Sequence, residues 1–117
     1  MKKKTKIREK DLDKAFSRYI RNRDGRCMRC GAADKPLFCM HYHSRVARSV
    51  RFNEFNAIAG CYACHAFLET RKTVEHRDLM YKIFGKKKMD EVERAYRRPR
   101  VRPPTEAEKQ LMLEQWA

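Results

Sequence analysis

The sequence predicts a small α+β domain stabilised by a zinc ion, with one helix before the zinc-binding segment and several helices after it. Two Cys-x-x-Cys pairs, Cys27/Cys30 and Cys61/Cys64, enclose the middle of the 117-residue chain. Each two-residue spacer lets both thiolates of a pair face one point, and two such pairs are the usual ligands of a tetrahedral structural zinc. A chain of this length forms only a modest core, so metal binding would contribute to its folding free energy.

The composition indicates a polyanionic partner. Lys and Arg total 29 against 15 Asp and Glu, a formal net charge of +14, and nucleic acid is the commonest partner of such a protein. No apolar run is long enough for a membrane span, and no apolar segment of a secretion signal follows the N-terminal lysines, so we expect no membrane partner and a cytoplasmic location with reduced thiols. Cys39 is the fifth, unpaired cysteine; a framework of two disulfides is the alternative to zinc.

Hydrophobic spacing and turn residues predict the elements and their order. The domain spans residues 11–97, after a basic arm at 1–10. A basic, proline-rich linker at 98–104 leads to a C-terminal helix at 105–117, which begins with the capping box Thr105-x-x-Glu108. This helix could pack on its own domain, on a partner subunit or on nothing. Within the domain we expect helices at 11–23, 61–72, 74–84 and 89–96, extended segments at 37–43 and 46–52, and a turn or short helical connection at 53–58.

The histidines suggest a second site next to the zinc. Cys64 and His65 are adjacent, so on a helix their side chains point about 100° apart. If Cys64 faces the zinc, His65 faces elsewhere, where the predicted strand with His41 could lie. For His76, which lies in a helix among charged residues, we predict a surface position.

A strand histidine, a downstream asparagine and a helix histidine directly after a CxxC pair resemble the constellation of HNH, or ββα-metal, nucleases. The resemblance implies that His41 is the general base, that Asn56 holds the base or its hairpin, and that His65 ligates a catalytic divalent cation, Mg²⁺ or Mn²⁺. A neutral imidazole with a pKa near 6.5 suits a base that works at neutral pH.

Five short segments of the sequence resemble one particular family more closely than HNH nucleases in general. The segments FSRYIRNRD (16–24), CMRCG (27–31), HYHSR (41–45), RFNEFN (51–56) and CYACH (61–65) resemble the NinG (Rap) recombination proteins of lambdoid phages. The similarity extends to about Tyr96 and leaves out the basic arm and the final helix. It implies a structure-selective endonuclease that cleaves branched DNA, such as Holliday junctions and D-loops, in the cytoplasm of the bacterial host.

Two features leave alternatives open. Met40 stands where HNH enzymes commonly have a second metal ligand, so the alternative function is a non-catalytic, zinc-containing protein that binds branched DNA; a zinc-containing adaptor is a third. His43 is a rival to His41, because residues two apart on a strand share a face and one could be the base and the other a ligand.

The sequence also suggests candidate DNA contacts and an oligomeric state. Arg45, Arg48 and Arg51 form either a phosphate track along an extended ribbon or a solvated edge, and Lys72 is a further candidate DNA contact. A homodimer would place two sites on the two strands of a junction.

Overall fold

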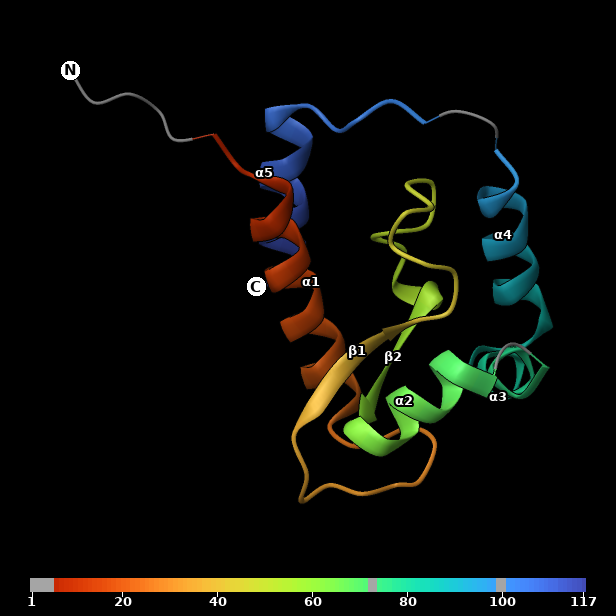
Figure 1. Cartoon of the computed structure of the whole chain (residues 1–117). Helices are drawn as coiled ribbons and strands as arrows, with labels where there is room; N and C mark the ends of the chain where they lie inside the picture. Colours follow the sequence, from red (N-terminus) through yellow and green to blue (C-terminus); the bar gives the residue numbers. More distant parts are fainter. Residues whose placement is uncertain (1–5, 72–73, 99–100) are drawn as a thin grey trace.

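The computed structural model describes residues 6–71, 74–98 and 101–117. An antiparallel hairpin lies at the centre, with α1 and α5 on one side of it and α3 and α4 on the other (Figure 1). This arrangement confirms the small α+β architecture. The elements of the described residues are α1 (Glu9–Asp24), β1 (Leu37–His41), the 3-10 helix η1 (Glu54–Asn56), β2 (Ala57–Cys61), α2 (Tyr62–Arg71), α3 (Val74–Phe84), α4 (Lys86–Tyr96) and α5 (Glu106–Gln115).

The hairpin connects the cysteines to the first histidine. Its register pairs Leu37 with Cys61 at one end and His41 with Ala57 at the other. Side chains of β1 alternate between its two faces. Met40 therefore packs into the core formed with α3 and α4, whereas the ring of His41 lies 5.8 Å from that of Phe16 on α1.

The predicted extended segment at 46–52 is wrong, because these residues form consecutive turns. The amide of Val50 donates to the carbonyl of Ala47, and the Val50 carbonyl accepts from Asn53, so the chain folds back on itself. The second strand is instead Ala57–Cys61, where every residue is buried. A half-exposed strand is recognised in a sequence by alternating apolar and polar residues. A strand buried on both faces lacks this alternation, and β2 also consists mostly of small residues.

The end of α1 is attached to the second strand. The amide of Ala59 donates to Oδ2 of Asp24 over 2.8 Å, and Arg23 donates to the carbonyls of Glu54 and Ala57. Gly25 then ends the helix in the left-handed conformation, at φ 67°. The loop that carries the first cysteine pair therefore begins from a point anchored on β2.

The final helix packs on its own chain, which answers the question that the sequence left open. The predicted capping box at Thr105 is present. Trp116 is only 5% exposed, and its ring lies 5.1 Å from that of Phe16. Lys109 also donates to the carbonyl of Ile7. Among the described helices, none is long and apolar enough to cross a membrane.

Candidate functional site

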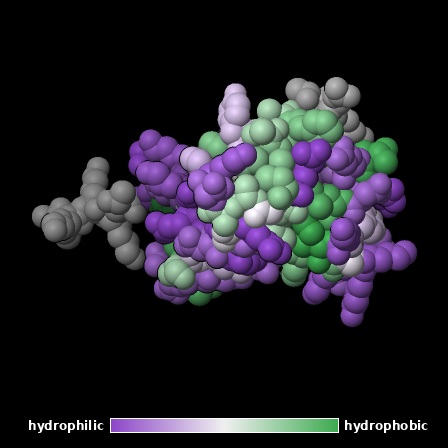
Figure 2. Space-filling view, turned by 90° about the horizontal axis from the view of Figure 1, so that it is seen from below, coloured by the Kyte–Doolittle hydropathy of each residue, from purple (hydrophilic) through white to green (hydrophobic). Residues whose placement is uncertain are grey.

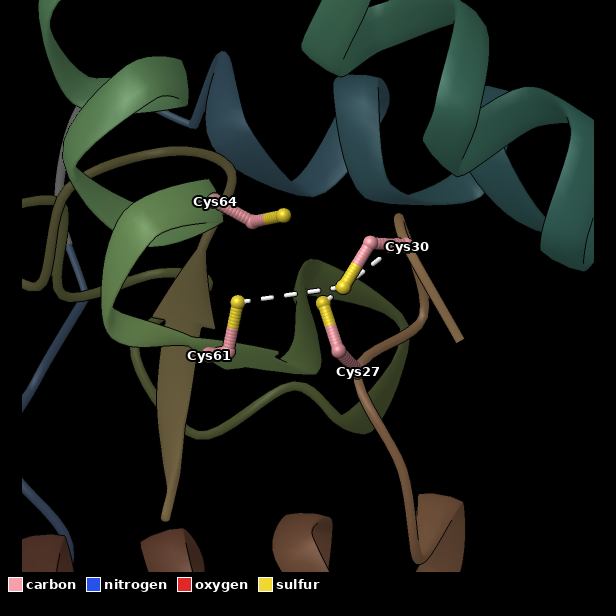
Figure 3. A group of neighbouring side chains, drawn as sticks. All are labelled: Cys27, Cys30, Cys61 and Cys64. Atoms are coloured by element: carbon pink, nitrogen blue, oxygen red, sulfur yellow. Dashed lines mark hydrogen bonds between the residues drawn. The ribbon is translucent and has the colours of Figure 1, made fainter. Parts of the chain in front are cut away.

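Four cysteines form a cluster that can hold a metal ion. The sulfurs of Cys27, Cys30, Cys61 and Cys64 all lie within 4.8 Å of one another, and the described residues contain no other group of three or more His, Cys, Asp or Glu so close. Figure 3 shows the four side chains converging from the loop after α1, the end of β2 and the first turn of α2. The sulfurs of Cys30 and Cys61 are 3.8 Å apart, which matches the edge of about 3.8 Å of a tetrahedron with Zn–S bonds of about 2.3 Å.

Local hydrogen bonds favour the thiolate of Cys27, whereas burial raises the pKa of the Cys64 thiol to about 12 despite the contact with Arg29. The amide of Cys30 points at the sulfur of Cys27 over 3.4 Å, and the guanidinium of Arg29 lies 3.4 Å from the sulfur of Cys64. Hydrogen bonds of this kind favour the charged form of the acceptor. Gly31 takes φ 81° and closes the turn. All five cysteines are free thiols, so the disulfide alternative is not formed, and Cys39 lies outside the cluster.

All four histidines of the chain line one cavity of about 780 Å³. His41 comes from β1, His43 from the loop that follows, His65 from α2 and His76 from α3. The cavity wall on the side of α1 consists of Asp13, Ser17 and Arg21. His41 and His65 therefore line the same cavity, although 24 positions separate them in the sequence.

His41 is held in one tautomer by the backbone. Its Nε2 lies 3.1 Å from the carbonyl oxygen of Arg51. A carbonyl only accepts hydrogen bonds, so Nε2 carries the proton and Nδ1 keeps its lone pair. Burial lowers the pKa of His41 below its usual value near 6.5. The imidazole is therefore neutral at neutral pH, with Nδ1 as its basic atom.

His43 has a different environment from His41. β1 ends at His41, so the two histidines do not share a strand face as predicted. Nε2 of His43 lies 2.8 Å from Oε1 of Glu93, and its ring stacks on Tyr96 at 3.7 Å with an angle of 3° between the planes. Both partners belong to α4. His43 is thus held by two contacts that leave its ring little freedom.

Asn56 fastens the loop between the strands. It is fully buried, and its Oδ1 accepts from the amide of His43 over 2.9 Å. Its Nδ2 donates to the carbonyls of His43 and Val50. Asn56 is the last residue of the 3-10 helix η1, and the capping of η1 falls to Asn53, which accepts from the amide of Phe55. The contacts of Asn56 are therefore those of a residue that holds a hairpin loop, not of a simple cap.

His65 faces the cavity together with a carboxylate one helical turn later. Nε2 of His65 lies 3.8 Å from Oε1 of Glu69, and its ring stacks on Phe38. Both side chains line the cavity. The i, i+4 spacing places them on one face of α2. That spacing was visible in the sequence and could have identified Glu69.

The predicted surface position of His76 is wrong. The residue is only 7% exposed, and its Nε2 is buried with no hydrogen-bond partner among the described residues. Burial, and then the charges of His65 and His43, lower the pKa of His76 to about 4. His76 lies three, four and seven residues before Leu79, Met80 and Ile83, on the apolar stripe of its helix. This periodicity was the signal that could have found it.

The three arginines proposed as a phosphate track bind acidic side chains of α1. Arg51 donates to both carboxylate oxygens of Asp13, at 2.6 and 3.0 Å. Arg48 pairs with Glu9 at 3.0 Å, and Arg45 lies 3.7 Å from Asp13. They lie on a loop of turns, not on an extended ribbon, and part of their charge is compensated. Lys72 lies outside the described residues.

A family model described as Bacteriophage Lambda NinG protein matches residues 1–114. The chain belongs to the NinG family. The match includes the basic arm and α5, so it extends beyond the span of resemblance found in the sequence. No curated protein and no solved structure gives a match. Membership of the NinG family implies a phage protein with a role related to recombination.

The cysteine cluster gives the first prediction. Cys61→Ser removes one of four thiolates, so we expect the purified protein to lose bound zinc and its melting temperature to fall by at least about 10 °C, since about 1 kcal/mol shifts a domain of this size by about 4–8 °C. Zinc per chain, from plasma mass spectrometry, and thermal unfolding provide the measurement. Cys39→Ser is the matched control and should keep one zinc. Equal zinc content in the two variants would refute the four-cysteine assignment.

The contacts of Asn56 give the second prediction. Asn56→Ala leaves three backbone groups without their partner, so we expect a loss of about 2–4 kcal/mol in the free energy of unfolding. Asn53→Ala removes only a cap and should cost about 1 kcal/mol. Urea denaturation measures both. If the two losses are equal, Asn56 does no more than cap a turn.

Proposed function

We propose that this NinG family member is a metal-dependent, structure-selective endonuclease that hydrolyses phosphodiester bonds in branched DNA such as Holliday junctions and D-loops. In this proposal the protein acts with an HNH-like site in the histidine cavity. The observation that carries it is the state of His41, a neutral, oriented imidazole whose Nδ1 is basic, in a cavity shared with His65. Zinc is the ion that we propose for the four cysteines.

His41 is the general base. With its Nε2 proton donated to the Arg51 carbonyl, Nδ1 is the atom that takes a proton from the attacking water. The charge that develops on the ring is stabilised by the same carbonyl, which is the role of an orienting partner. Asn56 keeps the loop in register with β2, so that the ring holds its direction.

The order of elements supports the HNH-like site. β1 carries the base, the loop carries Asn56, β2 returns beside β1, and α2 begins directly after it with His65 in its first turn. When bound, a divalent cation would stabilise the charge on the phosphate and on the leaving 3′ oxygen. His65 is the residue of α2 that we expect to hold it, with water and phosphate oxygens as further ligands.

A row of basic side chains on α1 supports DNA as the partner. Lys10, Lys14 and Arg18 follow one another at a spacing of four residues, all are exposed, and none forms an ion pair with a described residue. Arg21 continues the row to the cavity. Figure 2 shows hydrophilic residues over the side of the molecule formed by α1 and α5. We infer that this α1 row contacts DNA phosphates more than the compensated Arg48 and Arg51 do.

One observation favours a second candidate, a non-catalytic protein that binds branched DNA. Met40 is buried, and its side chain fills the space over Gly60, where an added Cβ would lie 2.3 Å from the terminal methyl group. The position before the base therefore cannot supply a metal ligand. Tight, salt-sensitive binding of branched DNA without cleavage under any divalent cation would select this candidate.

The base assignment gives a third prediction. With four-way, flap, splayed and duplex DNA in Mg²⁺ or Mn²⁺, we expect the parent protein to cleave branched substrates fastest, and His41→Ala to lower the rate constant about 10²- to 10⁴-fold. The fold should persist, as shown by circular dichroism and zinc content. His43→Ala is the matched control. If it abolishes cleavage while His41→Ala does not, His43 is the base.

The pH profile distinguishes a base from a merely structural histidine. A base must be neutral, and burial lowers the pKa of His41 below 6.5. The cleavage rate should therefore be level around neutral pH and fall on acidification only below pH 6.5. A rate that is already falling at pH 7.5 would contradict this assignment.

The α1 row gives a fifth prediction. Lys14→Gln combined with Arg18→Gln should weaken binding to all DNA sequences alike and reduce the slope of log K against log salt by about 1.8, about 0.9 for each lost phosphate contact. Fluorescence anisotropy at several salt concentrations measures the slope. Arg48→Gln is the matched control, since Glu9 already binds Arg48. If Arg48→Gln reduces the slope more than the double variant does, the phosphate contacts are made by the loop between β1 and β2 and not by α1.

A further inference from the structure

We propose that His76 is a metal ligand and that, with His65 and Glu69, it forms a two-histidine, one-carboxylate site for a first-row transition-metal ion in the cavity. The inference rests on the proposed function for the use of that ion in cleavage. The binding of the ion can be measured separately. His76 lies on α3 and belongs neither to the two CxxC pairs nor to the HNH-like residues.

The first support is the state of the His76 side chain. Buried polar atoms are nearly always hydrogen-bonded, and an exception needs an explanation. Nε2 of His76 is the exception among the described residues. Burial also disfavours the charged form, so the ring is a neutral imidazole, which is the form that binds metals. A side chain kept only for packing would be apolar here, as Met80 is one turn later.

The second support is a pair of donors on the neighbouring helix. His65 and Glu69 lie on one face of α2, 3.8 Å apart, and both line the cavity with His76. The side chain of His65 is one third exposed and that of Glu69 is 71% exposed. The three donor groups are not drawn together within 4.8 Å as the sulfurs are. The more exposed pair must therefore turn towards buried His76 when the ion binds.

The third support is that the other carboxylate and histidines of the cavity are engaged. The carboxylate of Asp13 is bound by Arg51. Met40 lies in the core, and His43 is engaged by Glu93 and Tyr96 of α4. In the proposed mechanism Nε2 of His41 donates to the Arg51 carbonyl, and Nδ1 must stay free to take the proton of the attacking water. A single ligand, His65, would leave the ion bound to the protein by one bond. His76 and Glu69 raise this number to three and leave positions open for water and phosphate oxygens.

The donor set decides the class of ion. Imidazole suits Fe²⁺, Ni²⁺, Cu²⁺ and Zn²⁺, carboxylate and water suit Mn²⁺, and two histidines with one carboxylate are a known set for Fe²⁺ with open positions. Mg²⁺ prefers oxygen ligands and gives up its water reluctantly. We therefore expect the site to bind Mn²⁺ and Co²⁺ at least ten times more tightly than Mg²⁺. This narrows the choice between Mg²⁺ and Mn²⁺ that the sequence left open.

The test is a titration of the full-length protein, loaded with one equivalent of zinc, with MnCl₂ or CoCl₂, followed by calorimetry and by Mn²⁺ paramagnetic resonance. Zinc keeps the four thiolates occupied, because thiolates favour Zn²⁺ over Mn²⁺. We expect one Mn²⁺ per chain, bound at least ten times more weakly by His76→Phe, which fills the buried space without a nitrogen. Lys82→Gln, exposed on the same helix, is the matched control and should bind like the parent.

A second measurement keeps the inference testable if His76→Phe does not fold. In the parent protein, substoichiometric Mn²⁺ should broaden the imidazole NMR signals of His76 and His65. Sharp His76 signals, an unchanged Mn²⁺ affinity in a folded His76→Phe variant, or equal affinity for Mg²⁺ would each overturn the inference.

Cleavage assays separate this inference from the proposed function. If His76-dependent Mn²⁺ binding is found but no DNA is cleaved, the metal site stands and the endonuclease fails. If cleavage depends on His41 but Mn²⁺ binds His76→Phe as it binds the parent, the inference about His76 fails alone.

Discussion

The convergence of four thiols on one point is the constraint on which the rest of the structure depends. Cys27 and Cys30 lie in the loop after α1, while Cys61 ends β2 and Cys64 lies in the first turn of α2. A tetrahedral ion held there would join three parts of a chain whose two larger hydrophobic clusters lie on opposite sides of a two-stranded sheet. It would also set the direction of α2, and with it the direction in which His65 points.

Opposite charges set the position of the loop between the strands. Arg51 is bound by Asp13 and by Glu9 of α1, and its carbonyl oxygen accepts the Nε2 proton of His41. One residue thus ties the first helix to the loop through its side chain and orients the candidate base through its backbone. Asn56 secures the same loop from inside. The contacts of Arg51 and Asn56 at the cavity wall are therefore structural in kind.

Sequence reasoning was most successful where the signal is local. The helix at α1, the end of α3 before Gly85, the capping box at Thr105 and the cysteine cluster all follow from spacing over a few residues. It failed at β2, where small buried residues show no alternation, and at His76, where charged neighbours concealed the apolar stripe. The burial of β2 depends on elements far away in the chain, whereas the apolar residues three, four and seven positions after His76 carried a local signal.

The sequence by itself determined the four-cysteine cluster, the positive charge and the NinG family, because each is a matter of residue type and short spacing. Only the tertiary structure decided which histidines share a space, which arginines are compensated and where α5 lies. His41, His65 and His76 line one cavity because β1, α2 and α3 all contribute to its wall, and the ring of Trp116 contacts that of Phe16, 100 positions earlier in the sequence. Such contacts between distant residues depend on how the elements pack, and no local pattern encodes that packing.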